Sequence, residues 1–450
     1  MASSLAPTRR LSLIARHLAG ASPLRSLSSS PSPTPVRNHS TSSSSPPQRY
    51  PYIFTTSAFF HGKPSYRPPT ADAQGGKLAQ GLPPSHPLVA WRDAQLEGAP
   101  KQGAGHDWFF VEGIQREGEG EVQGGLKEGE EGVRGVVMAV ADGVGGWEDS
   151  GVDPSHFSQA LMWFARERVR QAASSSALAS GKKGEPWTWP QEEGKRCGAK
   201  VRDLLQGAFE DVKKEEGIVA GSSTACIVAL DAETGLLHAT NLGDSGFLVL
   251  RPSAVSTSSP SSETSSSSSD SDSPSHPSFT HSYSLVHSQP PQIHFFNAPY
   301  QLSKFPRGED MSNALLNYPR DADVTNEGIQ LEDGDVVLVV TDGFSDNVFD
   351  KGEADLLISA VRSKVDAHFQ ALGKEEGRDV PPGEKDAELA SSIARTAVSF
   401  ARMISVREDK VTPFEVESRR WGAGGKDGFK GGKVDDVTVV VAVVRKVETA

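Results

Sequence analysis

The chain has 450 residues, a formal net charge of −12 at pH 7 and 36% hydrophobic residues. This length allows two average domains or one large domain, and we expect one domain enlarged by insertions, because serine-, glycine- and proline-rich stretches interrupt it repeatedly. Two cysteines, Cys197 and Cys226, cannot form a disulfide framework and lack a metal-binding spacing. The longest apolar runs, such as 439–444, are far shorter than the roughly 20 residues that span a bilayer, so we expect a soluble protein.

The N-terminal segment differs sharply from the rest. The first 70 residues contain eight basic side chains and no acidic one. Leu11, Ile14 and Leu18 recur at helical spacing among arginines, which is typical of a mitochondrial presequence, although a disordered basic tail is the alternative. We therefore expect residues 1–50 to be a transit peptide directing the protein to mitochondria, with the matrix as its compartment. Without the eight cations the remainder carries a charge of −20, which argues against nucleic-acid binding.

The predicted domain spans 51–446 and is followed by a short tail, 447–450. Strands are expected near Tyr52, around Asp107 and over 134–142. The Gly- and Glu-rich stretch 113–132 is expected to be an exposed insertion. A helix should begin after Asp153, its N-cap, with Pro154 in the first turn. Insertion 172–195 and a second helix, 200–214, then follow.

The second half of the domain repeats this alternation. Adjacent strands over 221–251 should turn at 231–235 and again at 243–246, which implies hairpins and an antiparallel sheet. The Ser-rich stretch 253–278 is too polar to be buried and should be a disordered insertion. A strand over 334–343, helices over 354–365 and 387–405, and a final strand complete the series. The predicted class is α+β, with helices covering sheet faces.

Acidic residues follow or precede several of the apolar runs: Asp142, Asp244, Asp342 and the pair Asp435 and Asp436. Carboxylates held at the rim of a sheet form an oxygen-ligand site for hard divalent cations. Each Asp-Gly pair could instead be a turn, and Asp244 could simply shape the GDSG turn. Strand alternation lets only one residue of the terminal pair face the metals, and we favour Asp435.

Five blocks in order resemble the metal-dependent protein phosphatases of type 2C, the PPM family: ADGVGGW, GSSTACIVAL, NLGDSGFLVL, VTDGFSDN and DDVTVVVAVV. The resemblance runs from about Tyr52 to Arg445, excluding the insertions. DGVGGW with VDPSHFS, GDSGF and HFFNAPYQLS is similar to the mitochondrial branch of that family. Ser222 and Ser223 have no arranged His or Asp partner, so we interpret them as strand-edge residues and not as nucleophiles.

The resemblance implies a four-layer α-β-β-α sandwich of two antiparallel sheets, with two Mn²⁺ or Mg²⁺ ions at one end. It also implies a monomeric serine/threonine phosphoprotein phosphatase, in which a metal-bridged water attacks phosphorus directly. The implied site residues are Asp142, bridging both metals, the Gly143 carbonyl, Asp342 and Asp435, with Asp107 orienting the site and Asp244 near a weaker third metal.

Three departures from the family pattern bear on mechanism. His106 stands where the family has a glutamate before Asp107, which would weaken the second metal site. Val144 replaces the histidine often assigned as general acid, and Gln102, next to Lys101, replaces a phosphate-binding arginine. These departures leave an alternative open, namely a catalytically weak or silent phosphatase fold that acts as a regulatory binding module. Retention of the clustered carboxylates argues against this alternative. Burying carboxylates costs free energy, and a binding module has no evident use for several of them at one point.

Overall fold

The computed structural model describes residues 50–64, 81–114, 133–173, 197–253, 281–308, 314–376, 380–425 and 428–448. The predicted presequence, apart from Tyr50, lies outside these residues, as do most of the three predicted insertions. Each predicted insertion begins one or two residues too early, because the preceding element extends into it: β2 continues to Ile114, α3 to Ala173 and β7 to Ser253.

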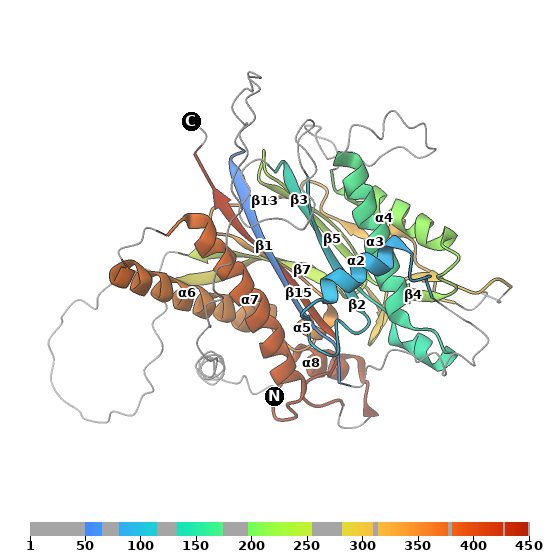
Figure 1. Ribbon diagram of the computed structural model, residues 1–450. Helices are drawn as coiled ribbons and strands as arrows, with labels where there is room; N and C mark the ends of the chain where they lie inside the picture. Colours follow the sequence, from blue (N-terminus) through green and yellow to red (C-terminus); the bar gives the residue numbers. More distant parts are fainter. Residues whose placement is uncertain are drawn as a thin grey trace, which may run out of the picture.

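Two antiparallel sheets form the centre of the molecule (Figure 1). The first has the order β1-β15-β14-β7-β8 and the second the order β12-β6-β5-β3-β2, with β13 also beside β6. The strands of the first sheet are β1 (Tyr52–His61), β7 (Gly246–Ser253), β8 (Ser282–Ser288), β14 (Val336–Val340) and β15 (Val437–Lys446). Those of the second are β2 (Asp107–Ile114), β3 (Gly135–Asp142), β5 (Ala225–Asp231), β6 (Leu236–Leu242), β12 (Asp323–Val324) and β13 (Ile329–Gln330). Two small ladders pair β4 (Gly221–Ser223) with β11 (Leu302–Lys304), and β9 (Ile293–Phe295) with β10 (Ala298–Pro299).

Helices cover the outer face of each sheet, as the sandwich expectation requires. On the second sheet lie α2 (Pro87–Leu96), α3 (Pro154–Ala173) and α4 (Cys197–Lys214). On the first lie α6 (Asp355–Glu376) and α7 (Pro382–Ser405), and Figure 1 shows them on the opposite side from α3 and α4. The short helices α5 (Asp342–Ser345) and α8 (Pro413–Trp421) lie near one end of the sandwich. The α+β class and the α-β-β-α architecture are therefore confirmed.

The valine run of β15 explains why the first sheet is buried on both faces. Every residue over 437–444 is buried. Val437, Val439 and Val441 belong to the core beneath α6 and α7, while Val440 belongs to the core between the two sheets. Because successive strand residues point to opposite faces, a strand covered on both sides needs an uninterrupted apolar sequence.

The start of α3 follows the sequence prediction closely. The Oδ1 atom of Asp153 accepts a hydrogen bond from the Ser155 backbone N–H at 2.9 Å, and Pro154 is the first helical residue. A proline is well suited to this position, because the first N–H groups of a helix have no partner within it. This cap fixes the chain that leaves the Asp142 loop.

The predicted hairpin at 243–246 is wrong. The β6 strand pairs with β5 in one sheet, whereas β7 pairs with β14 and β8 in the other. The chain therefore crosses between the sheets at Gly243, whose φ is 105°. The turn at 231–235 does join paired strands, β5 and β6.

Helices α2 and α8 are present in the structure but were not among the elements predicted from the sequence.

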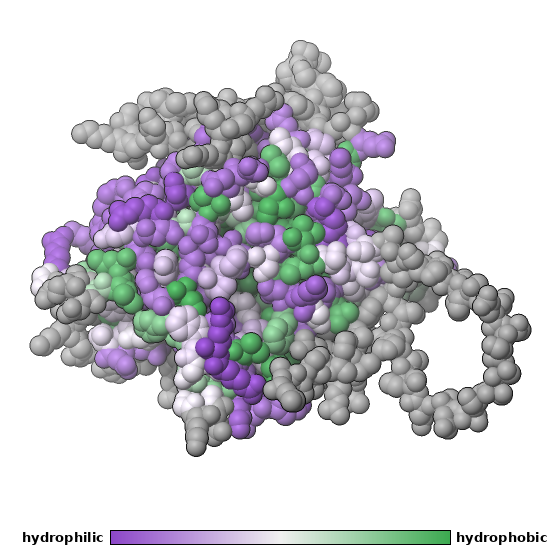
Figure 2. Space-filling view, turned by 180° about the vertical axis from the view of Figure 1, so that it is seen from behind, coloured by the Kyte–Doolittle hydropathy of each residue, from purple (hydrophilic) through white to green (hydrophobic). Residues whose placement is uncertain are grey.

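No helix within the described segments combines the length and apolarity needed to cross a bilayer. On the face opposite the view of Figure 1, separate hydrophobic patches are interleaved with hydrophilic side chains (Figure 2).

Candidate metal centre

Asp107 and Asp142 lie side by side at one end of the second sheet. They are direct partners in the antiparallel register of β2 and β3, at the point where β2 begins and β3 ends. The backbone of Asp142 is held on its other side by Thr224, whose hydroxyl accepts from the Asp142 N–H at 3.1 Å. The Ser223 hydroxyl donates to the Asp142 carbonyl at 2.8 Å, which confirms a structural role for this serine.

Asp342 reaches the same end from the first sheet. β14 ends at Val340, and α5 begins at Asp342. The intervening Thr341 donates its hydroxyl hydrogen to Asp107 Oδ2 at 2.8 Å and accepts from the Thr438 N–H at 3.0 Å. One buried hydroxyl therefore connects the acids of the two sheets.

Neither Asp-Gly pair is an ordinary turn with a left-handed glycine. Asp142 is the last residue of β3, and Asp342 is the first residue of α5. Gly143 is required by close packing instead, since a Cβ atom there would lie 2.6 Å from the Pro154 carbonyl oxygen. Gly343 has the same need, because its Cβ would overlap the Asp436 carbonyl oxygen.

Asp435 and Asp436 precede β15, so strand alternation does not decide between them. The Asp436 carboxylate is 1% exposed and accepts from two backbone N–H groups, those of Lys63 at 2.6 Å and His106 at 2.9 Å. Asp435 Oδ1 instead lies 3.1 Å from the Lys63 ammonium. The two carboxylates therefore differ in kind, one fixing backbone and the other facing charged side chains.

Lys433 is the residue of this centre that was missed at the level of sequence. Its ammonium nitrogen lies 2.5 Å from Asp342 Oδ2, 2.9 Å from Asp346 Oδ2 and 3.1 Å from Asp435 Oδ2. Asp346 was missed as well. It lies four residues after Asp342, and this spacing could have indicated that the two carboxylates share one face of a helical turn. No motif marked Lys433, which lies two residues before Asp435.

Asp244 lies at the edge of this group. Burial raises the pKa of Asp244 to about 6. The Lys433 ammonium lowers this pKa, and the negative charge of Asp346 raises it. The Oδ1 atom of Asp244 is buried without a hydrogen-bond partner. Asp244 is therefore within electrostatic reach of Lys433 and Asp346.

Burial and mutual repulsion dominate the electrostatics of the central acids. Burial raises the pKa of Asp142 well above its ordinary value, and the charges of Asp342 and Asp107 raise it further. Burial likewise raises the pKa of Asp107 and of Asp342, although the Lys433 ammonium opposes the shift at Asp342. Such a cluster favours a bound cation, because added positive charge offsets both effects.

Asp435 behaves differently. Burial would raise its pKa, but the ammonium groups of Lys433 and Lys63 together hold it below its ordinary value. This carboxylate is therefore ionised and paired with a lysine on each oxygen. It is 17% exposed, so it remains within reach of solvent.

The donor chemistry fits a hard divalent cation. In the described part of the chain, no group of three or more His, Cys, Asp or Glu side chains is arranged so that it could hold a metal ion. Three carboxylates instead share the Lys433 ammonium. The Oδ1 atoms of Asp107, Asp244 and Asp342 are nevertheless buried without hydrogen-bond partners, and carboxylate oxygens are the ligands that Mg²⁺ and Mn²⁺ prefer.

The neighbours of the acids also have defined places. His106 is buried, with Nε2 2.8 Å from Glu148 Oε1 and Nδ1 3.5 Å from the Lys63 ammonium. The Val144 N–H donates to the Ser222 carbonyl at 3.0 Å. Its aliphatic side chain has no proton to donate, so this position cannot supply a general acid.

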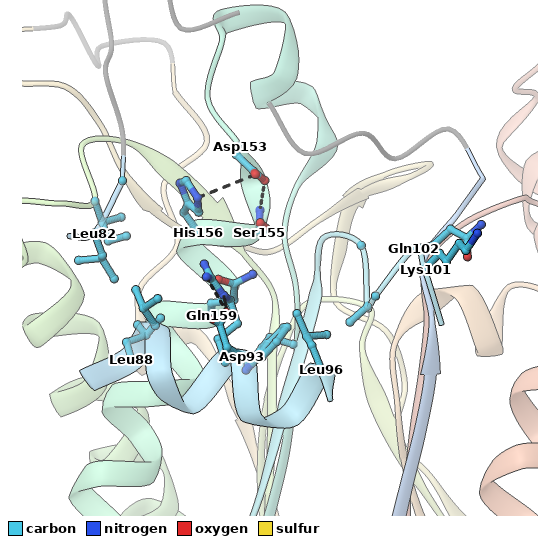
Figure 3. Close-up of a pocket in the computed structure, with 18 of the residues that line it drawn as sticks. Leu82, Leu88, Asp93, Leu96, Lys101, Gln102, Asp153, Ser155, His156 and Gln159 are labelled. Atoms are coloured by element: carbon cyan, nitrogen blue, oxygen red, sulfur yellow. Dashed lines mark hydrogen bonds and ion pairs between the residues drawn. The ribbon is translucent and has the colours of Figure 1, made fainter. Parts of the chain in front are cut away.

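A cavity of about 470 Å³ lies between α2, the start of α3 and the segment that leads into β2, and Figure 3 shows part of its lining. Figure 3 shows side chains from two helices facing it, among them Leu88 and Leu96 of α2 and His156 and Gln159 of α3. Lys101 and Gln102 line it too, as do Gly105 and Trp108, the neighbours of the pair His106 and Asp107. None of the predicted metal ligands, all of which the structure describes, lines this cavity. The positions linked by resemblance to phosphate binding are thus part of the wall of a cavity that includes none of the proposed ligands.

Comparison with curated proteins decides the family. The protein phosphatase PTC7 homolog fig of Drosophila grimshawi is 32% identical over 307 residues, which cover 68% of this chain and 74% of the relative. The chain belongs to the PTC7 family of protein phosphatases. The human protein phosphatase PTC7 homolog is 28% identical over 308 residues, covering 68% of this chain and 75% of the relative.

Membership of the PTC7 family confirms the predicted PPM-type relationship and the predicted enzyme class, a protein-serine/threonine phosphatase. Among solved structures, the photosystem II phosphatase PBCP covers 88% of this chain and 100% of its own, with 22% identity and a TM-score of 0.45. No family model matches the sequence.

Proposed function

We propose that this PTC7-family phosphatase hydrolyses phosphoserine and phosphothreonine in mitochondrial proteins, using two Mn²⁺ or Mg²⁺ ions held by its acidic centre. The observation that carries the proposal is the convergence of Asp107 and Asp142 from one sheet with Asp342 from the other. Burial of several carboxylates at one point is costly unless a cation or an ion pair compensates for it.

The residues proposed to hold the metals are Asp142, the Gly143 carbonyl, Asp342 and Asp435, with Asp244 near a weaker third ion. When bound, such ions lower the pKa of water and offset the charge of a phosphate under attack. Asp107 orients the centre through its hydrogen bond with Thr341. Thr224 holds the backbone of Asp142 in place, so the carboxylate is positioned before substrate arrives.

Protonation of the leaving alkoxide cannot come from position 144, which is valine. General acid catalysis typically contributes about 10²–10⁴-fold, so its loss should slow alkyl phosphates more than aryl phosphates, whose leaving groups need no proton. Lys101, on the cavity wall, is the cation proposed to attract the phosphoryl group.

The decisive experiment is Mn²⁺-dependent hydrolysis of a phosphothreonine peptide by the full chain. Asp142→Asn and Asp342→Asn should each lower the rate by more than about 100-fold, because each removes a proposed ligand. Asp386→Asn is the matched control, since Asp386 of α7 pairs with Arg445 near the far end of β15, away from the acidic centre. An unchanged rate in either site variant would refute the assignment.

A second candidate function is a phosphatase fold that binds phosphoproteins without turning them over. The Lys433 ammonium on three site carboxylates, together with Val144, is the observation that favours it. Metal titration followed by a phosphatase assay separates the two functions. Bound Mn²⁺ without turnover would support the binding module.

The mitochondrial location is proposed from the basic, acid-free N-terminal segment. Replacing Arg9, Arg10 and Arg16 with glutamine should prevent import into isolated mitochondria, because the segment would lose three of its positive charges. Import of this variant at the wild-type rate would contradict the proposal. N-terminal sequencing of the imported form would locate the cleavage point, and protease protection would test the matrix assignment.

A further inference from the structure

Lys433 holds the place of a cation within the acidic centre. Its ammonium group contacts one oxygen from each of Asp342, Asp346 and Asp435, at 2.5 to 3.1 Å. An ammonium has three hydrogens to donate, so the three contacts use its full donor capacity. The side chain is 16% exposed, and the group is therefore enclosed by its partners but not sealed from solvent.

The backbone of Lys433 is fixed independently of its side chain. The Lys433 N–H donates to Asn347 Oδ1 at 3.0 Å, and Asn347 Nδ2 donates to the Lys433 carbonyl at 2.8 Å. Asn347 is fully buried and also donates to the Gly343 carbonyl at 2.9 Å. Lys433 is thus tied through Asn347 to α5, the short helix that begins at Asp342, while its flexible four-carbon stem leaves the ammonium free to move.

The contacts of Lys433 overlap with those that a metal would need. Asp342 Oδ2 and Asp435 Oδ2 both point at the ammonium, and both residues are proposed metal ligands. A divalent cation and an ammonium cannot share these oxygens closely, because like charges at this separation repel strongly in a partly buried site. Asp346, which is not a proposed ligand, can keep the ammonium nearby after it leaves the other two.

We propose that Lys433 is an internal counter-ion that competes with divalent metal for Asp342 and Asp435. It stabilises the acidic centre when no metal is bound, and it must be displaced toward Asp346 when metal binds. Lys433 thereby sets the metal concentration at which the phosphatase becomes active. This inference rests on the proposed function, because it takes Asp342 and Asp435 to be metal ligands.

The other lysine of the centre does not meet the same criteria. The Lys63 ammonium lies 3.1 Å from Asp435 Oδ1, but within the described segments it forms no ion pair with Asp342 or Asp346. Its remaining carboxylate partner is Asp436, at 3.5 Å, which already accepts from two backbone N–H groups. Only one proposed ligand is therefore blocked by Lys63, and its removal should affect metal binding less.

The first test is calorimetric titration of metal-free, full-length protein with Mn²⁺. Lys433→Met should bind Mn²⁺ about tenfold more tightly than wild type, because the competing charge is gone while the aliphatic stem remains. Lys433→Arg, which keeps the charge, should stay close to wild type. Lys214→Met is the matched control, because Lys214 forms a largely exposed ion pair with Asp211 on α4.

The thermal stability of the metal-free protein is a second readout, and here removal of Lys433 should be harmful. In EDTA the Lys433→Met variant should melt at a lower temperature than wild type, because three carboxylates lose their counter-ion. In saturating Mn²⁺ the difference should shrink or reverse. A merely structural lysine would lower the melting temperature equally in both conditions, and that result would overturn the inference.

A third measurement uses the unaltered protein and so does not depend on a variant folding. Reductive methylation followed by mass spectrometry should label Lys433 more in Mn²⁺ than in EDTA, whereas Lys214 should be labelled equally in both. Equal labelling of Lys433, or Mn²⁺ affinity unchanged in Lys433→Met, would overturn the inference while leaving a Mn²⁺-dependent wild-type phosphatase intact. Wild-type protein that binds no Mn²⁺ would overturn the proposed function and this inference together.

Discussion

Thr341 joins the acidic groups of the two sheets by donating to Asp107 Oδ2 at 2.8 Å. The same hydroxyl oxygen accepts from the Thr438 N–H at the start of β15. Asp107 in turn faces Asp142 across the β2–β3 ladder. Thr341 therefore helps to fix the relative position of the two sheets at this end, together with the Asp436 carboxylate, which accepts from the His106 N–H. A small change at Thr341 should disturb the acidic centre.

Thr341→Val tests this dependence. Valine keeps the shape but leaves Asp107 Oδ2 and the Thr438 N–H without their partner, which should cost about 1–3 kcal/mol of unfolding free energy. Phosphatase activity at saturating Mn²⁺ should fall as well, because Asp107 loses its orientation. Thr325→Val is the control, since Thr325 accepts from the Ala239 N–H at 2.6 Å outside the centre. It should lower stability and leave the specific activity of the folded protein unchanged, and equal loss of activity in both variants would contradict the prediction.

Gly143→Ala should disrupt the loop after Asp142. The new methyl group would lie 2.6 Å from the Pro154 carbonyl oxygen and 3.0 Å from that of His106, so backbone must shift. Overpacking of this kind typically costs about 1–3 kcal/mol, and displacement of the proposed Gly143 carbonyl ligand should weaken Mn²⁺ binding. Chemical denaturation and calorimetric titration measure the two effects.

Gly146→Ala is the control for the glycine substitution. A Cβ atom at Gly146 meets nothing within 4 Å, although this residue, in the short 3-10 helix Gly145–Ser150, lies only three positions further along the chain. Its stability and Mn²⁺ affinity should therefore match those of wild type. Loss of both properties in Gly146→Ala would show that loop flexibility, and not the contact of Gly143 with Pro154, is what matters.

The sequence predicted most of the layers because their causes are local. The alternation of periodicities identified β3, α3, α7 and β15, and the cap at Asp153 placed the start of α3. The predicted acids converge because Asp107 and Asp142 lie at the ends of their strands, and Asp342 follows the end of β14 by two residues. The sequence contains this information, because in an antiparallel pair the start of one strand lies beside the end of the other, as Asp107 lies beside Asp142.

The parts that could not be predicted depend on pairing between distant segments. Nothing in NLGDSGF shows that β6 and β7 enter different sheets, because a hairpin turn and a crossing have similar composition. Lys433 was equally hidden, since a lone lysine near a strand is usually a solvated surface residue. Its role arises only when Asp346 and Asp342 are brought against it from 87 and 91 residues away.

Metal-free protein should show an unusual dependence of stability on pH through Asp244. Its pKa is raised to about 6 in the folded state by burial, against an ordinary value of 3.8. Between these values the folded protein holds a proton that the unfolded chain has lost, so stability falls as pH rises through this window. Asp244→Asn removes this penalty and should stabilise the protein in EDTA more at pH 7 than at pH 4.5.

Thermal melting at both pH values measures the effect for wild type and variant. The relevant quantity is the difference between the two proteins, because the other acids titrate in both. Added Mn²⁺ should reduce the difference at pH 7, since a cation near Asp244 favours its charged form. If the two proteins differ in melting temperature by the same amount at pH 4.5 and pH 7, the pKa of Asp244 is not raised by burial.

The two terminal acids should respond to substitution in opposite ways. Asp436 accepts from the N–H groups of Lys63 and His106, so Asp436→Ala leaves the buried His106 N–H without its partner, at about 1–3 kcal/mol, and the half-buried Lys63 N–H as well. Asp435→Asn leaves those two backbone contacts intact but removes a charged proposed ligand, which should lower Mn²⁺-dependent hydrolysis by more than about 100-fold. Denaturant unfolding and phosphopeptide hydrolysis, measured on the same preparations, separate the roles. If Asp435→Asn keeps its activity while folded Asp436→Ala loses it, Asp436 is the ligand and the assignment of the pair must be exchanged.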